Sequence, residues 1–545
     1  MKKLYFLALS IFASASLMAT QVKVVAGSDL QAAVDGASSG DTVLVQAGTY
    51  EGNFTMKEGV YVSGGWNEDF TAQTEHASIL DAKQSGRVLN QPKNFDTLTI
   101  WDNFTIQNGY LNKYVDQWGA GVALLTNGRV INCLVQNNSF GGEYSGNCAG
   151  GGICNNSGGD TCAINCVVRN NKATHGGGIR TAGIAVNCIV ENNEAANNGG
   201  GVYLHYLGGL HNSIVRNNVC KKDVGGVDMG AAGCAMYNCL IVGNHADGVI
   251  GGVQAREGNN VVNTTIVGNS HNTTSADRIV WAGFRASNNT PTKYNGKLFV
   301  NNVIWGNKHN GEVIAEQVMP YLKHYVSNGT FANNALQGTT ILDTTVTYIH
   351  LSAENNPQFN EDYSFAWTSP LYNAGSNDAL AYFVGDKDVY GNARKQGANM
   401  EIGAVELAEY KATVATIENG SLTLEFLGQQ LELVAGEYSL PEGFTATVVA
   451  TPAEGYVLDK ITIDQIALEA VEGVYTLPAI KSNIVLAATF VKQSTPTAVE
   501  NATNAAQVIA IYDMLGRQIH NTVNTLATGM YIVVTSEGTQ KISIK

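Results

Sequence analysis

The residues best placed for chemistry follow a repeated glycine step. The phrase Gly-Gly-Gly-Ile/Val, or a close variant of it, recurs with its last glycine at positions 121, 152, 178, 201, 226 and 252. Side chains that differ from copy to copy stand just after this step or two positions further on, and they are Cys154, Arg180, Tyr203, His205, Asp228, Gln254 and Arg256. Arginine or histidine can act as the base of a β-elimination, and a carboxylate such as Asp228 can bind Ca²⁺. The pattern predicts a patch for an acidic sugar, with a plain solvated surface as the alternative.

A second phrase shows which elements must position this patch. Variants of Asn-Cys-x-Val-x-Asn-Asn begin at Asn132, Asn165, Asn187, Asn212, Asn238, Asn263 and Asn301. Each copy holds a short run rich in β-branched residues that Asn-Asn or Gly-Asn closes, which is typical of a strand and turn. A period of 23 to 31 residues holds two or three strands but no crossover helix. The chain is therefore predicted to be all-β, with a right-handed parallel β-helix in which each coil stacks on the next.

Stacking makes specific predictions about side chains, because like residues lie over like. We expect an asparagine ladder whose amides hydrogen-bond from coil to coil, formed by Asn138, Asn171, Asn193, Asn218, Asn244 and Asn269. Two rows are assigned to the core: the small residues Cys133, Cys166, Cys188, Ser213 and Cys239, and the branched residues Val135, Val168, Val190, Val215 and Ile241. The residues between these rows are also apolar, so the opposite assignment stays open. The polar residues after the glycines then form one outward row.

All nine cysteines lie between Cys133 and Cys239, and two interpretations of them remain. They can be core thiols that act as small hydrophobic residues, or some can pair, with Cys148, Cys154 and Cys162 as the candidates outside the repeated row. An odd number leaves at least one unpaired. We expect no metal site, because no Cys/His spacing matches one, although Ca²⁺ at Asp228 remains open.

Composition and the first residues indicate an exported protein. The net charge of −14 and the 14% of charged residues exclude a basic face for nucleic acid. Residues 1–19 combine Met-Lys-Lys, an apolar stretch and a small-residue end, which predicts a secretory signal peptide. No other segment is apolar enough for a membrane span, so we predict none in the mature chain. The expected location is secreted or on the exterior of the outer membrane.

Two segments resemble the ends of known β-helices. Residues 28–34 predict a short amphipathic capping helix, and the strands after it resemble the N-terminal cap of pectin-lyase-like β-helices. Near the other end, the runs Ser369–Gly375, Asp388–Arg394 and Met400–Glu406 resemble the choice-of-anchor Q segment, which closes a β-helix in that family. Met400-Glu401 departs from that family's usual apolar-Asp pair. We assign residues 20–406 to the β-helix with these two ends.

Two smaller β-rich domains, sandwich-like or otherwise, are predicted beyond it. Residues 408–493 resemble the divergent internalin B-type repeat through the Pro452–Tyr456 turn and a closing strand. Residues 494–545 begin with a linker and resemble the type A C-terminal sorting domain of the type IX secretion system. That resemblance rests on Tyr512-Asp513-x-x-Gly516-Arg517, Leu526-x-x-Gly529-x-Tyr531 and the end Lys541–Lys545. It implies the type IX secretion machinery as a partner and passage across the outer membrane.

These features predict an exported, adhesin-like or glycan-binding β-helix protein that type IX secretion delivers to the cell surface. The rival function is a secreted polysaccharide lyase or glycosidase that acts on acidic glycans, and the third is an inert structural stalk. The predicted ligand-binding residues are Arg180, Tyr203, His205, Asp228, Gln254 and Arg256, called the polar row below. No catalytic residue can be assigned from the sequence. The exposed pair Lys221-Lys222 is expected beside the polar row.

Overall fold

The computed structural model describes residues 19–112, 118–141, 148–256, 258–276, 282–287, 298–315, 329–338, 347–382, 386–493, 507–536 and 538–544. It divides into two compact units, residues 1–409 and 410–545. Residues 1–18 of the predicted signal peptide and residues 494–506, which include most of the predicted linker, lie outside the described residues. No helix in the described part is long and apolar enough to cross a membrane.

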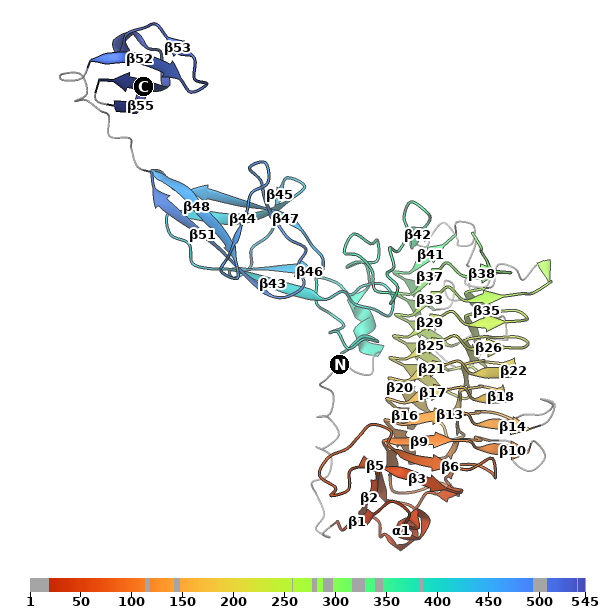
Figure 1. Cartoon of the computed structure of the whole chain (residues 1–545). Coiled ribbons are helices and arrows are strands. Elements are labelled where there is room, and N and C mark those ends of the chain that lie inside the picture. Colours follow the sequence, from red (N-terminus) through yellow and green to blue (C-terminus); the bar gives the residue numbers. More distant parts are fainter. Residues whose placement is uncertain are drawn as a thin grey trace. The chain divides into compact units, whose positions relative to one another are not determined.

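The first unit is a right-handed parallel β-helix, as the repeats predict, and each regular coil contributes one strand to each of four parallel sheets (Figure 1). Sheet A consists of β1 (Gln21–Val24), β2 (Thr42–Gln46), β5 (Tyr61–Trp66), β8 (Thr99–Asp102), β12 (Gly128–Ile131), β16 (Thr161–Ile164), β20 (Ile184–Val186), β24 (Gly209–His211), β28 (Ala235–Tyr237), β32 (Asn260–Val262), β36 (Leu298–Val300) and β40 (Thr330–Ala332). Sheet B follows it in each coil and consists of β3 (Gly48–Glu51), β6 (Ser78–Asp81), β9 (Phe104–Gln107), β13 (Leu134–Gln136), β17 (Val167–Arg169), β21 (Ile189–Glu191), β25 (Ile214–Arg216), β29 (Leu240–Val242), β33 (Thr265–Val267), β37 (Val303–Trp305), β41 (Ala335–Gln337) and β42 (Ile349–Leu351).

Sheets D and C complete each coil, in that order along the chain. Sheet D consists of β10 (Tyr110–Asn112), β14 (Ser139–Gly141), β18 (Lys172–His175), β22 (Glu194–Asn198), β26 (Val219–Cys220), β30 (His245–Ala246), β34 (Ser270–His271) and β38 (Lys308–His309), with β39 (Glu312–Val313) antiparallel at its end. Sheet C consists of β4 (Phe54–Thr55), β7 (Leu89–Asn90), β11 (Val122–Leu124), β15 (Ile153–Asn155), β19 (Ile179–Thr181), β23 (Val202–Leu204), β27 (Val227–Met229), β31 (Val253–Arg256) and β35 (Phe284–Ser287).

The N-terminal end carries the predicted capping helix. Helix α1 (Leu30–Gly36) begins after Asp29, whose side chain accepts a hydrogen bond from the Ala32 amide. Such a cap satisfies one of the amides that the first helical turn leaves without a partner. Leu30 and Val34 are buried in the main core, so the helix closes that end of the solenoid with its apolar side.

The repeated phrase has the predicted orientation. Cys133, Val135, Cys166, Val168 and their apolar equivalents in later coils belong to the main core, and Ser213 of the same row is fully buried, which confirms the assignment of inward residues. All nine cysteines are buried and none forms a disulfide, so the candidates for pairing, Cys148, Cys154 and Cys162, are not joined to one another. Burial raises the pKa of Cys162 and of Cys239 to about 12, which keeps these thiols protonated and inert.

The predicted asparagine ladder is present and continues one coil further, to Asn307. Each ladder amide donates to the side-chain oxygen of the next one, at 2.9 Å from Asn218 to Asn244 and at 3.0 Å from Asn269 to Asn307. The left-handed conformation falls one residue earlier, for example at Asn217 with φ 55°. A second ladder, which we did not expect, joins the first asparagines of the phrase, with Asn187 donating to Asn165 at 3.1 Å.

The glycine step turns the chain sharply from sheet D into sheet C. Gly176 has φ +62°, a conformation that side chains disfavour. A Cβ on Gly201 would lie 2.6 Å from Val215 Cγ1 and 2.9 Å from the Nδ2 of ladder residue Asn218. The step therefore packs directly against the next coil and its asparagine ladder. This close approach leaves sheet D as a separate lobe with small cores of its own, one of them formed by Ala195, Cys220 and Ala246.

The flanking segment, which consists of the described residues between 357 and 407, lies along the flank of the solenoid. It includes the 3₁₀ helix η3 (Asn377–Tyr382), and it covers the outward faces of sheets A and B over the later coils. On sheet B it buries Ile214, Leu240 and Val267 against Ala404. This contact explains why the residues between the core rows are apolar as well: in these coils they form a second apolar face.

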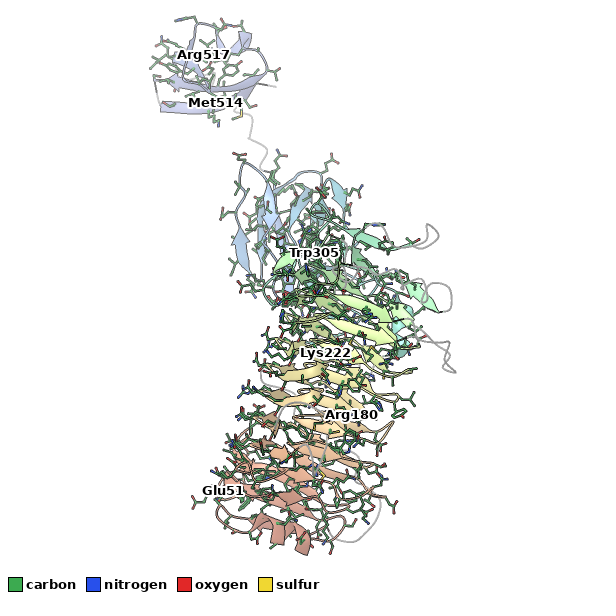
Figure 2. The ribbon with its side chains drawn as sticks, turned by 90° about the vertical axis from the view of Figure 1, so that its right-hand side faces the viewer. Glu51, Arg180, Lys222, Trp305, Met514 and Arg517 are labelled. Atoms are coloured by element: carbon green, nitrogen blue, oxygen red, sulfur yellow. The ribbon has the colours of Figure 1, made fainter. Side chains whose placement is uncertain are left out.

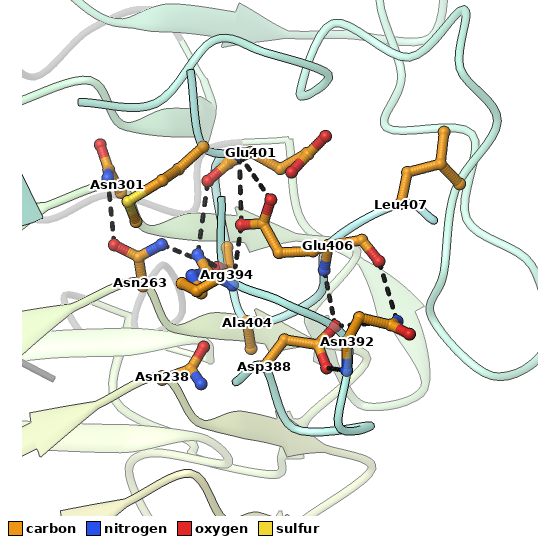
Figure 3. A network of polar contacts seen from close by, with 12 residues as sticks. Asn238, Asn263, Asn301, Asp388, Asn392, Arg394, Glu401, Ala404, Glu406 and Leu407 are labelled. Atoms are coloured by element: carbon orange, nitrogen blue, oxygen red, sulfur yellow. Dashed lines mark hydrogen bonds and ion pairs between the residues drawn. The ribbon is translucent and has the colours of Figure 1, made fainter. Parts of the chain in front are cut away.

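A buried polar network shapes this flanking segment (Figure 3). Arg394 forms a salt bridge of 3.1 Å with Glu406, both with no exposed side-chain surface, and donates to the Gly403 carbonyl at 2.6 Å. The Asp388 carboxylate accepts the Glu406 amide at 2.8 Å. Asn263 and Asn301 of the second ladder bind the segment's backbone at Gly403 and Ser376. Arg394, Glu406 and Asp388 thus fold the segment, and the second ladder attaches it to the coils.

The second unit consists of two β-rich parts whose strands pair mostly antiparallel, with β43 and β51 as a parallel pair. One part has a five-stranded sheet of β46 (Glu437–Pro441), β43 (Glu409–Val414), β51 (Ile484–Lys492), β48 (Tyr456–Ile463) and β49 (Ile466–Leu468), and a four-stranded sheet of β45 (Gln429–Gln430), β44 (Gly420–Phe426), β47 (Ala446–Pro452) and β50 (Tyr475–Leu477). The other part has one sheet of β53 (Gln518–Ile519), β52 (Val508–Asp513), β54 (Gly529–Thr535) and β55 (Gly538–Ile544), with the 3₁₀ helix η4 (Val523–Thr525) between β53 and β54.

Candidate functional site

The first residues of the polar row lie in register on sheet C. Arg180 pairs with Tyr203, Tyr203 with Asp228, and Asp228 with Gln254 in successive strands. Their neighbours on either side, such as Val202 and Leu204, belong to the main core. Because side chains alternate along a strand, the polar row points out of the solenoid, as predicted. Figure 2 labels Arg180 on the middle coils of this surface.

The polar row is not a solvated surface, and this expectation was wrong. Arg180 is only 7% exposed, Asp228 0% and Gln254 9%, while Tyr203, His205 and Arg256 are half-buried. The cause is a second row of residues just before the glycine step, which runs back from sheet D toward sheet C. Its members pair in parallel from coil to coil, and we call them the return ladder: Trp118, Ala149, His175, Asn198, Val224 and Ile250.

The return ladder lies against the polar row and contacts it directly. The Arg180 guanidinium stands 4.8 Å from the centre of the Trp118 ring, and the rings of His175 and Tyr203 are 5.5 Å apart. Asn198 donates to Asp228 Oδ2 at 2.7 Å. The glycine step makes this possible, because its tight turn sets the two rows face to face. We call this meeting of the two rows the polar corner.

Two clusters form within the polar corner. In the first, Arg180 donates to Asn156 Oδ1 and lies 3.2 Å from His205 Nδ1, and Tyr203 stacks on His205 with ring centres 6.0 Å apart. A Cβ on Gly230 would lie 2.4 Å from the Tyr203 hydroxyl, so a glycine in the next coil leaves room for that ring. The structure therefore brings Arg180, Tyr203 and His205 together as predicted.

The second cluster is centred on Asp228. Gln254 donates to Asp228 Oδ1 at 3.3 Å and accepts a hydrogen bond from Arg285 Nη1 at 3.0 Å. Burial raises the pKa of Asp228 to about 6, although Asn198, Arg256 and Gln254 favour its charged form. Arg256 is thus electrostatically coupled to this cluster. Both oxygens of Asp228 already accept amide hydrogens, and no group of three metal-binding side chains gathers in the described part of the chain.

Several charged groups meet at the polar corner. The guanidinium groups of Arg180, Arg256 and Arg285 lie there with the carboxylate of Asp228, and the carboxylate of Asp223 acts electrostatically on Asp228 and His175. Burial, together with the positive charges of Arg180 and Arg256, lowers the pKa of His205 to about 4, and burial also lowers the pKa of His175. Both histidines are therefore neutral. The exposed Lys222 acts on His175 as a further positive charge, so the predicted Lys221-Lys222 pair does stand beside this region.

Sequence reasoning missed several members of the polar corner. Trp118, His175 and Asn198 stand at one fixed offset before the glycine step, so the repeat register contained them, but only the residues after the step were considered. Arg285 follows Ala-Gly-Phe instead of Gly-Gly-Val, and that departure hid it from the pattern. Asn156 lies in a loop between sheets, where the repeat has no constant length.

A cavity of about 640 Å³ lies elsewhere on the first unit, at one of its last described coils. Its lining includes Phe331, Tyr348, Ile349 and Ile402, and it contains no residue of the polar row. Phe331 stacks on the core residue Phe299 with ring centres 5.5 Å apart. Residues 339–346, next to this lining in the chain, lie outside the described residues, and we assign the cavity no role.

Comparison with known proteins gives likenesses of fold alone. No family model matches this sequence, and no curated protein matches it either. Among solved structures, pectate lyase Pel9A is similar with a TM-score of 0.37 and 15% identity, over 71% of this chain and 96% of that one. A capsular polysaccharide depolymerase, tailspike protein gp49 of Acinetobacter baumannii bacteriophage Fri1, has a TM-score of 0.32 and 11% identity, over 86% and 84%.

A third similar structure is a mannuronic acid specific polysaccharide family 6 lyase from human gut microbiota. Its TM-score is 0.26 and its identity 10%, over 61% of this chain and 92% of that one. Likeness at this level does not show what this chain binds or whether it is an enzyme. The function proposed below rests on the polar corner instead.

Proposed function

We propose that this chain is an exported β-helix protein that binds an acidic glycan at the rim of the polar corner. The observation that carries the proposal is Arg180, a guanidinium more than nine-tenths buried that forms no salt bridge with any described residue. A buried charge is costly unless an opposite charge compensates it. A carboxylate of a uronic acid at the rim, beside half-buried His205 and Arg256, supplies that charge.

The charge of Arg180 supports an anionic ligand over a neutral one. Its guanidinium has no carboxylate partner among the described residues, and His205 beside it is neutral, so nearby groups offset little of this positive charge. Guanidinium groups bind carboxylates through paired, charge-assisted hydrogen bonds. This local charge opposes the net charge of −14 of the whole chain, which would otherwise repel a polyanion.

The test is a titration of the full chain with uronic acid oligosaccharides by calorimetry. Arg180→Gln should weaken binding about tenfold or more, because it removes a charged hydrogen-bond donor. Arg216→Gln is the matched control, since Arg216 is exposed on sheet B and pairs with Glu191 at 2.7 Å. Equal binding by Arg180→Gln and the wild type would contradict the proposal. No binding of any glycan would favour the inert stalk.

One observation keeps the lyase as a second candidate. A neutral histidine, His205, lies beside a guanidinium, and such a pair can remove a proton next to a carboxylate that the guanidinium neutralises. The proton would pass to the imidazole, the C–H electrons would form a double bond in the sugar, and the glycosidic oxygen would leave with the C–O electron pair and take up a proton from water. Ultraviolet absorbance of the unsaturated product, lost in His205→Ala, would establish this chemistry. Glycan retained without such absorbance supports binding alone.

We further propose delivery to the cell surface by the type IX secretion machinery, with residues 494–545 as the sorting domain. Asp513, Gly516 and Arg517, which carry part of this resemblance, form a hydrogen-bonded turn. Asp513 accepts the amides of Leu515 and Arg517 and binds Arg517 Nε at 2.7 Å, while Gly516 takes φ +78° in the same turn. Deletion of residues 496–545 should leave the protein in the periplasm. Surface display of the truncated protein would refute this route.

A further inference from the structure

The loop between β23 and β24, which carries His205 of the polar corner, has an unusual backbone conformation. Its residues Tyr206 and Leu207 have φ of 37° and 58°. Between residues 103 and 310, every other described residue that is not glycine and has a positive φ is asparagine, the residue that tolerates this conformation best. Tyr206 and Leu207 therefore break the asparagine pattern of these coils, and the adjacent pair Lys83 and Gln84 in an early coil is a second such case.

The same two residues expose apolar surface. Tyr206 is 67% exposed and Leu207 51%, although both follow a strand whose alternate residues are buried. Neither the positive φ angles nor the exposed apolar side chains of this loop stabilise the folded state. Such outliers persist where a function requires the conformation.

The loop stands beside Arg180. The loops at 156–160 and 205–208 connect sheet C to sheet A in two coils. In the coil between them, only Ala182 and Gly183 make this connection, from β19 to β20. A Cβ on Gly158 would lie 3.9 Å from the Tyr206 carbonyl oxygen, which shows that these two loops meet. Asn156 of one loop and His205 of the other both contact the Arg180 guanidinium.

His205 also fixes the orientation of the Tyr206 ring. The two rings are 4.1 Å apart between centres and nearly perpendicular, at 87°. The chain thus places an exposed aromatic ring next to the imidazole that contacts Arg180. This arrangement offers an apolar surface and a positive charge side by side.

We propose that Tyr206 stacks on the pyranose ring of the same acidic glycan whose carboxylate binds at Arg180. The C–H face of a pyranose is apolar, and an aromatic ring packs on it while the hydroxyl groups remain hydrated. The inference rests on the proposed glycan binding and adds the ring contact that selects a cyclic uronic acid over a simple anion. Leu207 extends the same apolar surface.

The experiment measures binding of uronic acid oligosaccharides to the full chain by calorimetry and by ligand NMR. Tyr206→Ala should weaken binding about tenfold, while Tyr206→Phe should bind as the wild type does. Tyr110→Ala is the matched control, because Tyr110 is 40% exposed on β10 and away from the loop. The ring protons of the bound sugar should shift upfield with the wild type and Tyr206→Phe, and not with Tyr206→Ala.

The outcomes separate this inference from the proposed function. If Arg180→Gln loses binding but Tyr206→Ala binds like the wild type without loss of the upfield shift, the stacking role is wrong and glycan binding stands. If the wild type binds no uronic acid oligosaccharide, both fall. Tyr206→Gly guards against misfolding, because glycine accepts φ 37° without strain, and it should lose binding as Tyr206→Ala does.

Discussion

Two outward faces of the same coils have opposite characters. On sheet B, Ile214, Leu240 and Val267 form an apolar face that the flanking segment covers. On sheet C, Arg180, Tyr203 and Asp228 form a polar face that the return ladder covers. Both are buried, so burial alone does not separate scaffold from site. The two faces differ in the pairing of their buried guanidinium groups. The flank pairs Arg394 with Glu406, whereas Arg180 in the polar corner has no carboxylate partner among the described residues.

The largest expected effect tests whether the flanking segment buries the apolar face of sheet B. Leu240→Asp places a charge at a site 1% exposed and should cost about 5 kcal/mol of the free energy of unfolding, because the charge has no partner there. Leu134→Asp is the matched control, since Leu134 occupies the same position in an earlier coil and is half-buried. Denaturant unfolding of the first unit measures both. Equal losses would show that the flanking segment contributes nothing to that burial.

The buried ion pair of the flank should have the next largest effect. Arg394→Met leaves Glu406 charged and unpaired with no exposed surface, which should cost about 4 kcal/mol. Arg216→Met breaks an ion pair of which one side chain is 44% exposed, and should cost less than about 1 kcal/mol. If Arg394→Met unfolds at the same denaturant concentration as the wild type, the network does not stabilise the flank.

The free energy of unfolding, measured as a function of pH, distinguishes a carboxyl group of the polar corner from one of the flanking segment. Burial raises the pKa of Asp228 to about 6 from 3.8, so the folded state binds this proton more tightly than the unfolded state does. Its contribution to stability is complete below pH 3.8 and is lost as the pH rises through about 6, a change of about 3 kcal/mol. Asp228→Asn should remove this dependence. Glu401, whose pKa burial raises to about 8, should lose its contribution between pH 4.5 and 8, and Glu401→Gln tests that window.

The smallest expected effect concerns strain at the rim. Tyr206→Gly should stabilise the first unit by about 1 kcal/mol, because glycine adopts a positive φ without the cost that a bulky side chain has. Val25→Gly, at a residue 50% exposed without a positive φ, should not stabilise it. Thermal unfolding compares the two variants. A loss of stability in Tyr206→Gly would mean that the Tyr206 ring supports the fold.

Much of the fold could be predicted from the repeats. The period of the two phrases predicted the coil, and small residues such as Cys166 and Cys188 marked the core row correctly, because stacking repeats the same environment in every coil. The asparagine ladder followed from the same reasoning. The sequence also placed Arg180, Tyr203 and Asp228 in one outward row. The domain assignments beyond residue 406 and the sorting route stay predictions.

What the sequence did not predict is what covers each outward face. A repeat gives the positions of residues within one coil, and those positions determine which side chains point inward. It does not contain the packing of residues 357–407 on the flank, because no period relates that segment to the coils. The repeat does contain the positions of His175 and Asn198, but not the turn angle that packs them against sheet C. The sequence by itself therefore determined the β-helix and the outward polar row. Only the tertiary structure decided that the row is buried, since the angle of the glycine turn brings two separate rows together. It also placed the exposed Tyr206 next to the half-buried His205.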